Sequence, residues 1–395
     1  MNLLERLGFW TDADGAQPVR SLVREVSDRY VAPVAAELDA TERFPAEIYA
    51  ELARAGLFGI TVPAALGGGG GRALEYLWVM EGLGHGCASV ADQVGLVELV
   101  GSLLAAHGTP AQCDRYLPGL LRAELRCSYA LTEAAAGSDL RAVASRAVPD
   151  GGGWRLSGEK VFIHNAPVAD FALVLAKTGG GLSTFLVDLD LPGVSRPYRE
   201  HKMGQRASPL GGLLFEDVRL APGALLGEAG RGFGYVSAAL AKGRLGIAGL
   251  SLGVARCAIE AAVAHAGSRV AFGRPIGAHQ AIGFRLADAV VEFRAAALLC
   301  ADAARALDAA PSGRDGGNAD VAVACSMAKL YASEHALRAA DLAVQVFGGA
   351  GYVRGGVAER VYRDARITTI YEGTSEIQRL IISRSLLSGD NGRVA

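Results

Sequence analysis

The spacing of apolar residues changes twice along this chain, and that change limits the folds available to it. From about residue 17 to 120, apolar residues recur every three or four positions, which predicts amphipathic helices. After Cys127, short apolar runs alternate with Gly-rich turns, which predicts a small antiparallel β domain. Helical spacing returns at Gly232 and continues to about Leu387. We therefore expect a mainly α protein with a central β domain, divided into an N-terminal helical domain (1–124), a middle β domain (125–231) and a C-terminal helical domain (232–395).

Composition and charge exclude several classes of protein. The 395 residues are 51% apolar, which is ample for a sizeable core, and the net charge of −2 with scattered Lys and Arg gives no sign of a nucleic-acid footprint. No window of 18 residues is both continuously apolar and free of charge, so we expect no membrane span. The start of the chain, MNLLER, lacks the pattern of a secretory signal, which favours a cytoplasmic location.

The spacing of cysteine and histidine gives no support for a metal site. The six cysteines form no C-x-x-C pair and mostly lie in apolar helical surroundings, which predicts buried thiols in a reducing compartment. The seven histidines show no H-E-x-x-H or H-x-x-E-H spacing. We therefore expect no bound metal.

Glycine-rich stretches do not indicate a nucleotide fold. The run from Gly67 to Gly71 is not followed by Gly-Lys-Ser/Thr, so we interpret it as a flexible loop rather than a phosphate-binding loop. No G-x-G-x-x-G follows a predicted strand and opens a helix, which argues against a βαβ dinucleotide fold. A second Gly-rich stretch, residues 311–318, is expected to be a loop between two helices.

One carboxylate, Glu372, stands among apolar neighbours immediately before a predicted helix. Ser375 with Gln378 three residues later predicts a capping box at the start of that helix. A carboxylate that is half-removed from water has its charged form disfavoured, so its pKa rises toward the range that suits a general base. Glu372 is therefore the leading candidate for a catalytic residue.

Five segments, the last of them around Glu372, strengthen this interpretation: 129–139 (YALTEAAAGSD), 158–170 (GEKVFIHNAPVAD), 269–280 (RVAFGRPIGAHQ), 345–352 (QVFGGAGY) and 363–378 (RDARITTIYEGTSEIQ). In this order they resemble the signatures of the acyl-CoA dehydrogenase family. The resemblance implies a three-part fold whose C-terminal part is a four-helix bundle, with FAD between the bundle and the β domain. It also implies oxidation of an acyl thioester at its α and β carbons, with Glu372 taking the α-proton. FAD would take the β-hydride, since no amino-acid side chain accepts a hydride.

The resemblance also assigns roles to individual residues. Arg244 would lie close to the base and shape its surroundings, and the backbone N–H of Glu372 with a flavin ribityl hydroxyl would hold the thioester oxygen. Gly243 stands where some family branches carry an alternative base, which sharpens the assignment to Glu372. Residues implied to bind FAD are Tyr129, Leu131, Thr132, Gly137, Ser138, Phe162, Ile163, His164, Arg269, Phe272, Gln280, Gln345, Gly348, Gly349, Thr374 and Glu376.

Three departures from the family pattern stand out. Phe162 replaces the Trp that many members place against the flavin ring, so an aromatic shield is kept. His164 replaces a Thr that hydrogen-bonds flavin N5, and because histidine titrates near neutrality it would alter the flavin potential or oxygen reactivity. The positions after Glu133 in the segment 133–137 lack the Pro and Gly that usually follow this Glu in the family, which leaves the local geometry open.

Alternatives to an acyl-CoA substrate remain open at this point. Residues 165–170 resemble relatives that act on acyl groups held by a carrier protein, and the Ala-, Gly- and Arg-rich composition fits bacteria that make polyketides. A flavin monooxygenase or oxidase on the same fold is disfavoured by Glu372, and a non-enzymatic helical scaffold would not explain the five segments. The resemblance further implies electron-transfer flavoprotein or another electron acceptor. It implies a homodimer or homotetramer as well, because Arg269 and Gln345 would reach the FAD of a neighbouring subunit.

Overall fold

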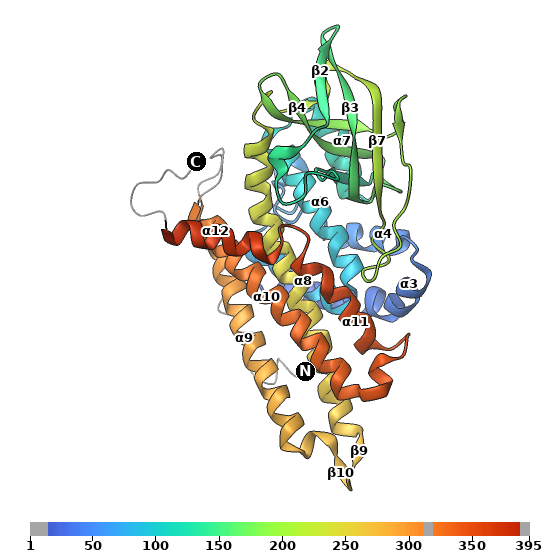
Figure 1. Cartoon of the computed structure of the whole chain (residues 1–395), viewed down its shortest axis with the longest axis vertical. Helices are drawn as coiled ribbons and strands as arrows, with labels where there is room; N and C mark the ends of the chain where they lie inside the picture. The colour runs from blue at the N-terminus through green and yellow to red at the C-terminus, as the bar shows by residue number, and fades with distance from the viewer. Residues whose placement is uncertain (1–14, 311–318, 388–395) are drawn as a thin grey trace.

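The computed structural model describes residues 15–310 and 319–387. The expected loop at 311–318 and the start of the chain lie outside the described residues. Helices come first, then a sheet, then helices again, as the apolar spacing predicts (Figure 1). The N-terminal helices are α2 (Gln17–Val26), α3 (Ala35–Thr41), α4 (Ala46–Arg54), α5 (Ala73–Gly86), α6 (Ala88–His107) and α7 (Pro110–Leu121).

Helices α5 and α6 form the core of the N-terminal part. Most residues of both are buried on every side of the helix, so these two helices are core helices rather than amphipathic surface helices. Thr109 caps α7 by accepting the backbone N–H of Gln112 at 3.3 Å, and Pro110 occupies the first helical position. The Gln112 amide also donates to the carbonyls of Gly223 and Leu225, at 2.8 and 2.9 Å. The cap of α7 thus ties the helical part to the β domain.

The run from Gly67 to Gly71 forms a loop, as predicted, and backbone hydrogen bonds hold it against residues 59–62; its flexibility stays a prediction. The backbone N–H groups of Gly69 and Gly70 donate to the carbonyls of Gly59 and Val62, at 2.9 and 2.8 Å. A Cβ at Gly68 would lie only 2.3 Å from the Val62 carbonyl oxygen. Glycine is required here because two stretches of backbone approach each other directly.

The middle part is one sheet with the strand order β6-β7-β3-β2-β4-β5-β8. Its strands are β1 (Cys127–Ala130), β2 (Arg146–Asp150), β3 (Gly153–His164), β4 (Phe171–Thr178), β5 (Gly181–Asp188), β6 (Val194–Ser195), β7 (Leu210–Leu220) and β8 (Leu225–Leu226). Most pairs are antiparallel as expected, but β4 pairs in parallel with β1 and, at one position, with β2. The sheet is therefore mixed, because β1 enters from the helical part and lies alongside β4 without a hairpin between them.

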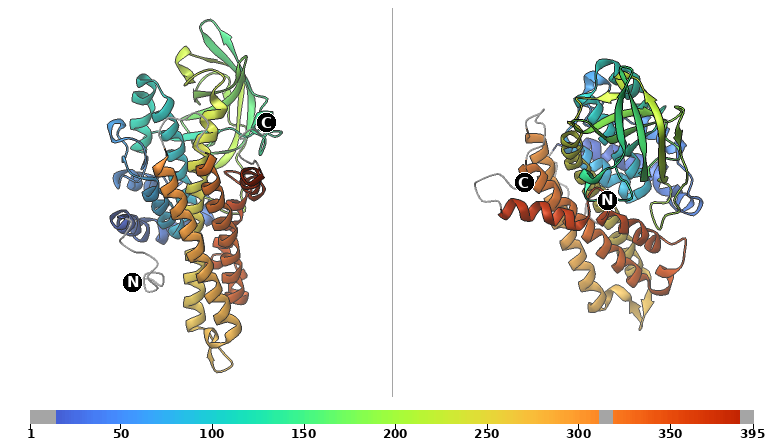
Figure 2. Two further views of the ribbon diagram at one scale, coloured as in Figure 1. Left: turned by 90° about the vertical axis from the view of Figure 1, so that its left-hand side faces the viewer. Right: turned by 45° about the horizontal axis from the view of Figure 1, so that its top comes forward.

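The C-terminal part consists of α8 (Gly232–Ser268), α9 (Gln280–Ala309), α10 (Ala319–Phe347), α11 (Val357–Arg366) and α12 (Ser375–Leu387). Figure 2 shows α8, α9 and α10 side by side as a bundle. Helix α8 also packs closely on α5, since a Cβ at Gly253 would lie 2.2 Å from the Glu81 carbonyl oxygen. The small side chains of this part serve close helix packing.

By length and composition alone, α6 and α8 could each cross a membrane. Their most apolar windows are 83% and 72% buried inside the fold, which is the behaviour of core helices. The six cysteines are free thiols, five of them buried and Cys257 half-buried.

Candidate active site

Glu372 lies on the short loop between the 3₁₀ helix η9 (Ile367–Thr369) and α12. Its backbone is in the left-handed region, with φ of 52°, and Gly373 follows with φ of 91°. This conformation turns the carboxylate toward α8, where a Cβ at Gly243 would lie 2.4 Å from Glu372 Oε2. Oε2 is buried and has no hydrogen-bond partner among the described residues. Oε2 of Glu372 is therefore free to accept a proton or a hydrogen bond, and the carboxylate fits in this position because residue 243 on α8 has no side chain.

Burial raises the pKa of Glu372 to about 7, although the charges of Arg244 and Lys329 lower it and that of Asp92 raises it. Arg244 is itself 8% exposed on α8, and burial lowers its pKa while the charge of Glu372 opposes that shift. A carboxylate with this pKa accepts a proton readily near neutral pH.

The start of α12 differs from the predicted capping box. Thr374, rather than Ser375, caps the helix by accepting the backbone N–H of Ile377 at 3.3 Å. The Gln378 side chain does not return to the cap residue; its Nε2 donates to the carbonyls of Gly373 and Glu372, at 2.8 and 3.3 Å. The prediction was wrong by one residue because Gly373, Thr374 and Ser375, three consecutive positions at the start of the helix, all suit a cap.

The loop after β1 is fixed by a buried ion pair. Lys160 on β3 donates to Glu133 Oε1 at 2.8 Å and to the Leu131 carbonyl at 2.9 Å. Glu133 also accepts the backbone N–H groups of Ala144 and Ser145, at 2.6 and 3.0 Å. These bonds define the geometry of segment 133–137, which the sequence left open. Thr132 is half-buried within this loop, and Leu131 is buried.

The part of this loop that follows Glu133 is exposed to solvent at its outer turn. Gly137 and Ser138 are exposed at its outer turn. Tyr129 comes before the loop on β1, and its hydroxyl is buried without a hydrogen-bond partner among the described residues.

A bulge in β3 presents Phe162. The register with β7 shifts between Lys160 and Ile163, and Phe162 has φ of 54° within the bulge. Its ring is 60% exposed, whereas Ile163 is 1% exposed in the core of the sheet. Phe162 is thus available for stacking, while Ile163 can offer a ligand only its backbone.

His164 ends β3 inside a polar network. Its Nε2 lies 2.6 Å from Ser208 Oγ and 2.9 Å from Gln93 Nε2. Gln93 and Asn165 pair through both amide groups, at 2.8 and 3.0 Å, and Ser208 Oγ donates to Asp92 Oδ2 at 2.7 Å. The other ring nitrogen of His164, Nδ1, lies 3.4 Å from Asp92 Oδ2. Burial lowers the pKa of His164, so its titration lies below the neutral range that the sequence suggested.

The remaining predicted cofactor residues fall into two groups. Thr374 and Glu376 line a pocket of 450 Å³ beside the Glu372 loop, together with Ile370 and Ser375. A second group lies at the opposite end of α8, beside the hairpin of β9 (Val270–Ala271) and β10 (Arg274–Pro275) (Figure 1). This group, which we call the tip residues, consists of Arg269, Phe272, Gln280, Gln345, Gly348 and Gly349, all exposed.

Within a single chain, the tip residues lie far from the other predicted cofactor residues. Helix α8 has 37 residues, which corresponds to a length of about 55 Å. Its first residue, Gly232, contacts Ser183 in the β domain, and Arg269 follows its last residue. No dinucleotide reaches from one end of such a helix to the other.

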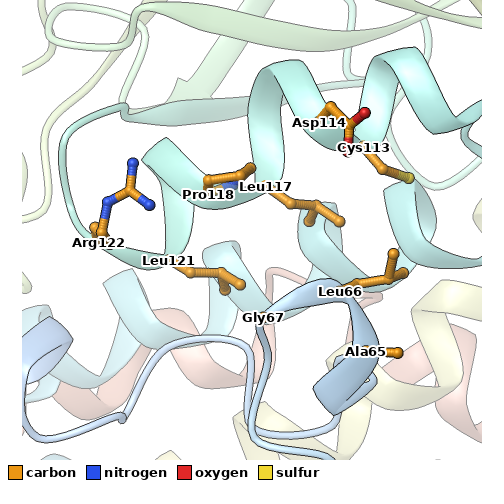
Figure 3. Close-up of a pocket in the computed structure, with 9 residues that line it drawn as sticks. All are labelled: Ala65, Leu66, Gly67, Cys113, Asp114, Leu117, Pro118, Leu121 and Arg122. Atoms are coloured by element: carbon orange, nitrogen blue, oxygen red, sulfur yellow. The ribbon is translucent and has the colours of Figure 1, made fainter.

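A separate cavity of 370 Å³ lies between the Gly-rich loop and α7, lined by residues that include Leu66, Cys113 and Arg122 (Figure 3). None of the predicted site residues lines it. Among the described residues, no group of three or more His, Cys, Asp or Glu side chains could hold a metal ion.

Sequence reasoning missed four charged or polar residues of the site: Asp92, Lys160, Lys329 and Gln378. Lys329 had a detectable signal, because it is a lone charge in the apolar stretch 321–332 of a predicted helix. Asp92 and Lys160 act through contacts between distant segments and carry no local pattern, whereas Gln378 stood out only as part of the expected capping box.

The residues present fit FAD. Phe162 offers an exposed aromatic face at a strand bulge, and the buried hydroxyl of Tyr129 has a free hydrogen-bonding site. At the tip, Gly348 and Gly349 leave the open space that the FAD of another subunit would need, because a Cβ at either position would lie more than 4 Å from every described residue other than its chain neighbours. These features suit a ligand with a flat ring system and a long polar tail.

Comparison with known proteins identifies the family. The models of the acyl-CoA dehydrogenase N-terminal, middle and C-terminal domains match residues 14–124, 128–218 and 230–387. This chain belongs to the acyl-CoA dehydrogenase family. The predicted family, fold class and FAD cofactor are confirmed, and the protein is an FAD-dependent oxidoreductase that oxidises an acyl thioester at its α and β carbons.

Relatives in this family match nearly the whole length of the chain. The mitochondrial short-chain specific acyl-CoA dehydrogenase of Bos taurus is 40% identical over 378 residues, which cover 94% of this chain and 90% of that protein. CarC, a caffeyl-CoA reductase-Etf complex subunit of Acetobacterium woodii, is 38% identical over 93% of this chain and 97% of its own. The solved butyryl-CoA dehydrogenase from Megasphaera elsdenii superposes with a TM-score of 0.89 at 33% identity, covering 96% of this chain and 99% of that one.

Proposed function

We propose that Glu372 is the catalytic base that removes the α-proton of an acyl-CoA. The observation that carries this proposal is the buried, unpartnered Oε2 of Glu372 beside Gly243, on a carboxyl group whose pKa burial raises to about 7. At neutral pH this carboxylate is partly deprotonated and has a free lone pair to accept the proton. FAD, when bound, supplies the acceptor for the β-hydride.

Other groups of this chain assist that step. The positive charges of Arg244 and Lys329 limit the rise in the pKa of Glu372, so its basic form stays accessible. The backbone N–H of Glu372 makes no hydrogen bond with any described residue, so it is free to donate to the thioester oxygen as negative charge develops there. The residues that would hold FAD in the same chain are Tyr129, Thr132, Ser138, Phe162, Thr374 and Glu376.

The test is anaerobic flavin reduction with Glu372→Gln. The amide cannot accept the proton, so we expect the rate of flavin bleaching by acyl-CoA to fall about 10²–10⁴-fold or more while flavin content stays unchanged. Glu216→Gln, an exposed change on β7, is the matched control and should keep the wild-type rate. Wild-type bleaching by Glu372→Gln would require another base.

We also propose that the enzyme is a homo-oligomer, at least a dimer, in which the tip residues of one subunit complete the FAD site of another. Two observations support this: the length of α8 separates the two groups of cofactor residues, and α9 carries exposed apolar residues at intervals of seven. Phe284, Val291 and Leu298 are 63%, 68% and 55% exposed, and Phe272 at the tip is 95% exposed. A repeat of seven forms one stripe along a helix and suits packing against another helix. Light scattering should give a mass that is two or more times the 40.8 kDa of one chain. A monomer with full flavin content would contradict the proposal.

For substrate and electron acceptor, we propose an acyl-CoA and an electron-transfer flavoprotein. The support is the names of the relatives above, which refer to CoA thioesters and, for CarC, to a complex with Etf. An acyl group on a carrier protein is the second candidate, since segment 165–170 resembles relatives that use one. Presenting the same acyl group on CoA and on a carrier protein under anaerobic conditions decides between them, and faster bleaching by the carrier-protein thioester would overturn the choice of CoA.

A further inference from the structure

A lysine buried beside the catalytic loop makes no ion pair with any described residue. Lys329 on α10 is 0% exposed, and none of the salt bridges within 4 Å between described residues includes it. Its Nζ donates instead to the carbonyl of Gly373 at 2.7 Å. Burying a charged amino group is costly unless its contacts compensate, so a lone contact to a backbone carbonyl at this position needs an explanation.

The same carbonyl receives a second buried donor from another helix. Gln378 on α12 is 0% exposed, and its Nε2 donates to Gly373 O at 2.8 Å and to Glu372 O at 3.3 Å. Lys329 and Gln378, from α10 and α12, therefore hold the peptide carbonyl that directly follows the base. We call this pair of donors the carbonyl clamp.

The carbonyl clamp acts on the part of the backbone that has the most unusual conformation. Glu372 has φ of 52° and Gly373 has φ of 91°. For a residue with a Cβ, such as Glu372, the left-handed conformation costs about 1–2 kcal/mol and persists only where surrounding contacts enforce it. That conformation points the carboxylate at the gap beside Gly243, so losing it would move the base away from its position.

The charge of Lys329 acts in the same place. The charged groups that face it are Glu372, Arg244, Glu376 and Glu334, and burial lowers the pKa of Lys329 to about 8, so it is mostly protonated at neutral pH. Its positive charge, like that of Arg244, lowers the pKa of Glu372, while the charge of Asp92 raises it. Gln378 makes the equivalent hydrogen bond without a charge.

We propose that Lys329 is a positioning residue for the base: together with Gln378 it fixes the Gly373 carbonyl, holds Glu372 in its left-handed conformation, and keeps the basic form of Glu372 accessible through its charge. The proposal rests on Glu372 being the base. Lys329 does not touch the thioester and takes no part in proton transfer.

Two variants separate the hydrogen bond from the charge. Lys329→Met removes one donor and the positive charge, whereas Gln378→Met removes the other donor and leaves the charge. Both should lower the rate of anaerobic flavin reduction, by about 10²-fold if the base moves by about 1 Å, and should lower kcat with little change in KM. Lys177→Met, an exposed change on β4, is the control and should match the wild type.

The pH dependence of the rate distinguishes an electrostatic role of Lys329 from a purely structural one, because a structural role would leave that dependence unchanged. The rate rises as Glu372 loses its proton, so in Lys329→Met this rise should shift to higher pH, because the charge that lowers the pKa of Glu372 is gone. In Gln378→Met the rise should stay at the wild-type pH while the plateau falls. Flavin absorbance and thermal unfolding establish that each variant is folded, and Gln378→Met still tests the clamp if Lys329→Met does not fold.

Wild-type rates and pH profiles in both variants would overturn the proposal. A fall in rate for Lys329→Met without any shift in its pH profile would overturn the electrostatic part. These outcomes differ from failure of the base assignment, since that failure appears as wild-type flavin reduction by Glu372→Gln.

Discussion

Gly243→Ala should impair catalysis far more than it affects stability. The added Cβ would lie 2.4 Å from Glu372 Oε2, 3.1 Å from Glu372 Cδ and 3.3 Å from Leu99 Cδ2, whereas ordinary contacts begin at 3.4 Å. The carboxylate must therefore move by about 1 Å, and a displacement of that size costs about 10²-fold in rate. On stability, alanine in a helix gains about 1 kcal/mol over glycine, and the overlap costs about 1–3 kcal/mol. The free energy of unfolding should therefore fall by at most about 2 kcal/mol.

The assay for Gly243→Ala is anaerobic stopped-flow reduction of the flavin by acyl-CoA, with urea unfolding measured in parallel. Gly234→Ala is the matched control, because it is on the same helix and a Cβ there has no other atom within 4 Å. The control should keep the wild-type rate. If Gly243→Ala reduced flavin as fast as the wild type, the carboxylate would not need its position beside α8, and the geometric argument would be refuted.

Three other changes test separate parts of the structure. Glu372→Gln should be more stable than the wild type at pH 8, by at most about 3 kcal/mol. Burial raises the pKa of Glu372 from 4.5 to about 7, so the wild type loses stability as the pH rises between these values. Urea unfolding at pH 8 and at pH 4.5 should show the difference only at pH 8. Lys160→Met should lower the free energy of unfolding by about 3–5 kcal/mol and reduce flavin content, because Glu133 would be left buried without its partner. Flavin content and stability equal to those of the wild type would show that the ion pair does not hold the loop. His164→Thr should lower the flavin midpoint potential relative to the wild type only at pH values below the ordinary titration range of histidine, because burial lowers the pKa of His164 and its positive charge would stabilise reduced flavin. Parallel potential–pH curves would show that His164 only packs.

The order of helices and strands could be predicted because it depends on local spacing. The apolar period of α2, α8 and α10 and the short runs of β4 and β5 lie within single segments. The resemblance of five segments supplied the family, FAD and the reaction, all of which the comparisons confirm. The identity of Glu372 as a carboxylate removed from water was likewise available from its apolar neighbours.

Contacts between distant segments could not be predicted. The packed backbone around Gly68 and the parallel pairing of β1 with β4 each depend on how separate stretches meet. The same is true of one half of the carbonyl clamp: Lys329 lies 44 residues from Gly373 along the chain, whereas Gln378 lies only 5 residues away. Periodicity identifies which residues are buried, but it does not show which buried polar groups contact each other.

The most direct test of Glu372 as the base is the pH dependence of anaerobic flavin reduction by acyl-CoA with hydrogen or deuterium at the α carbon. The account predicts a primary isotope effect and a rate that rises with pH through about 7, the pKa of Glu372, with both features lost in Glu372→Gln. A wild-type rate that does not change with pH around 7, or a Glu372→Gln variant that keeps both the rate and the isotope effect, would contradict it.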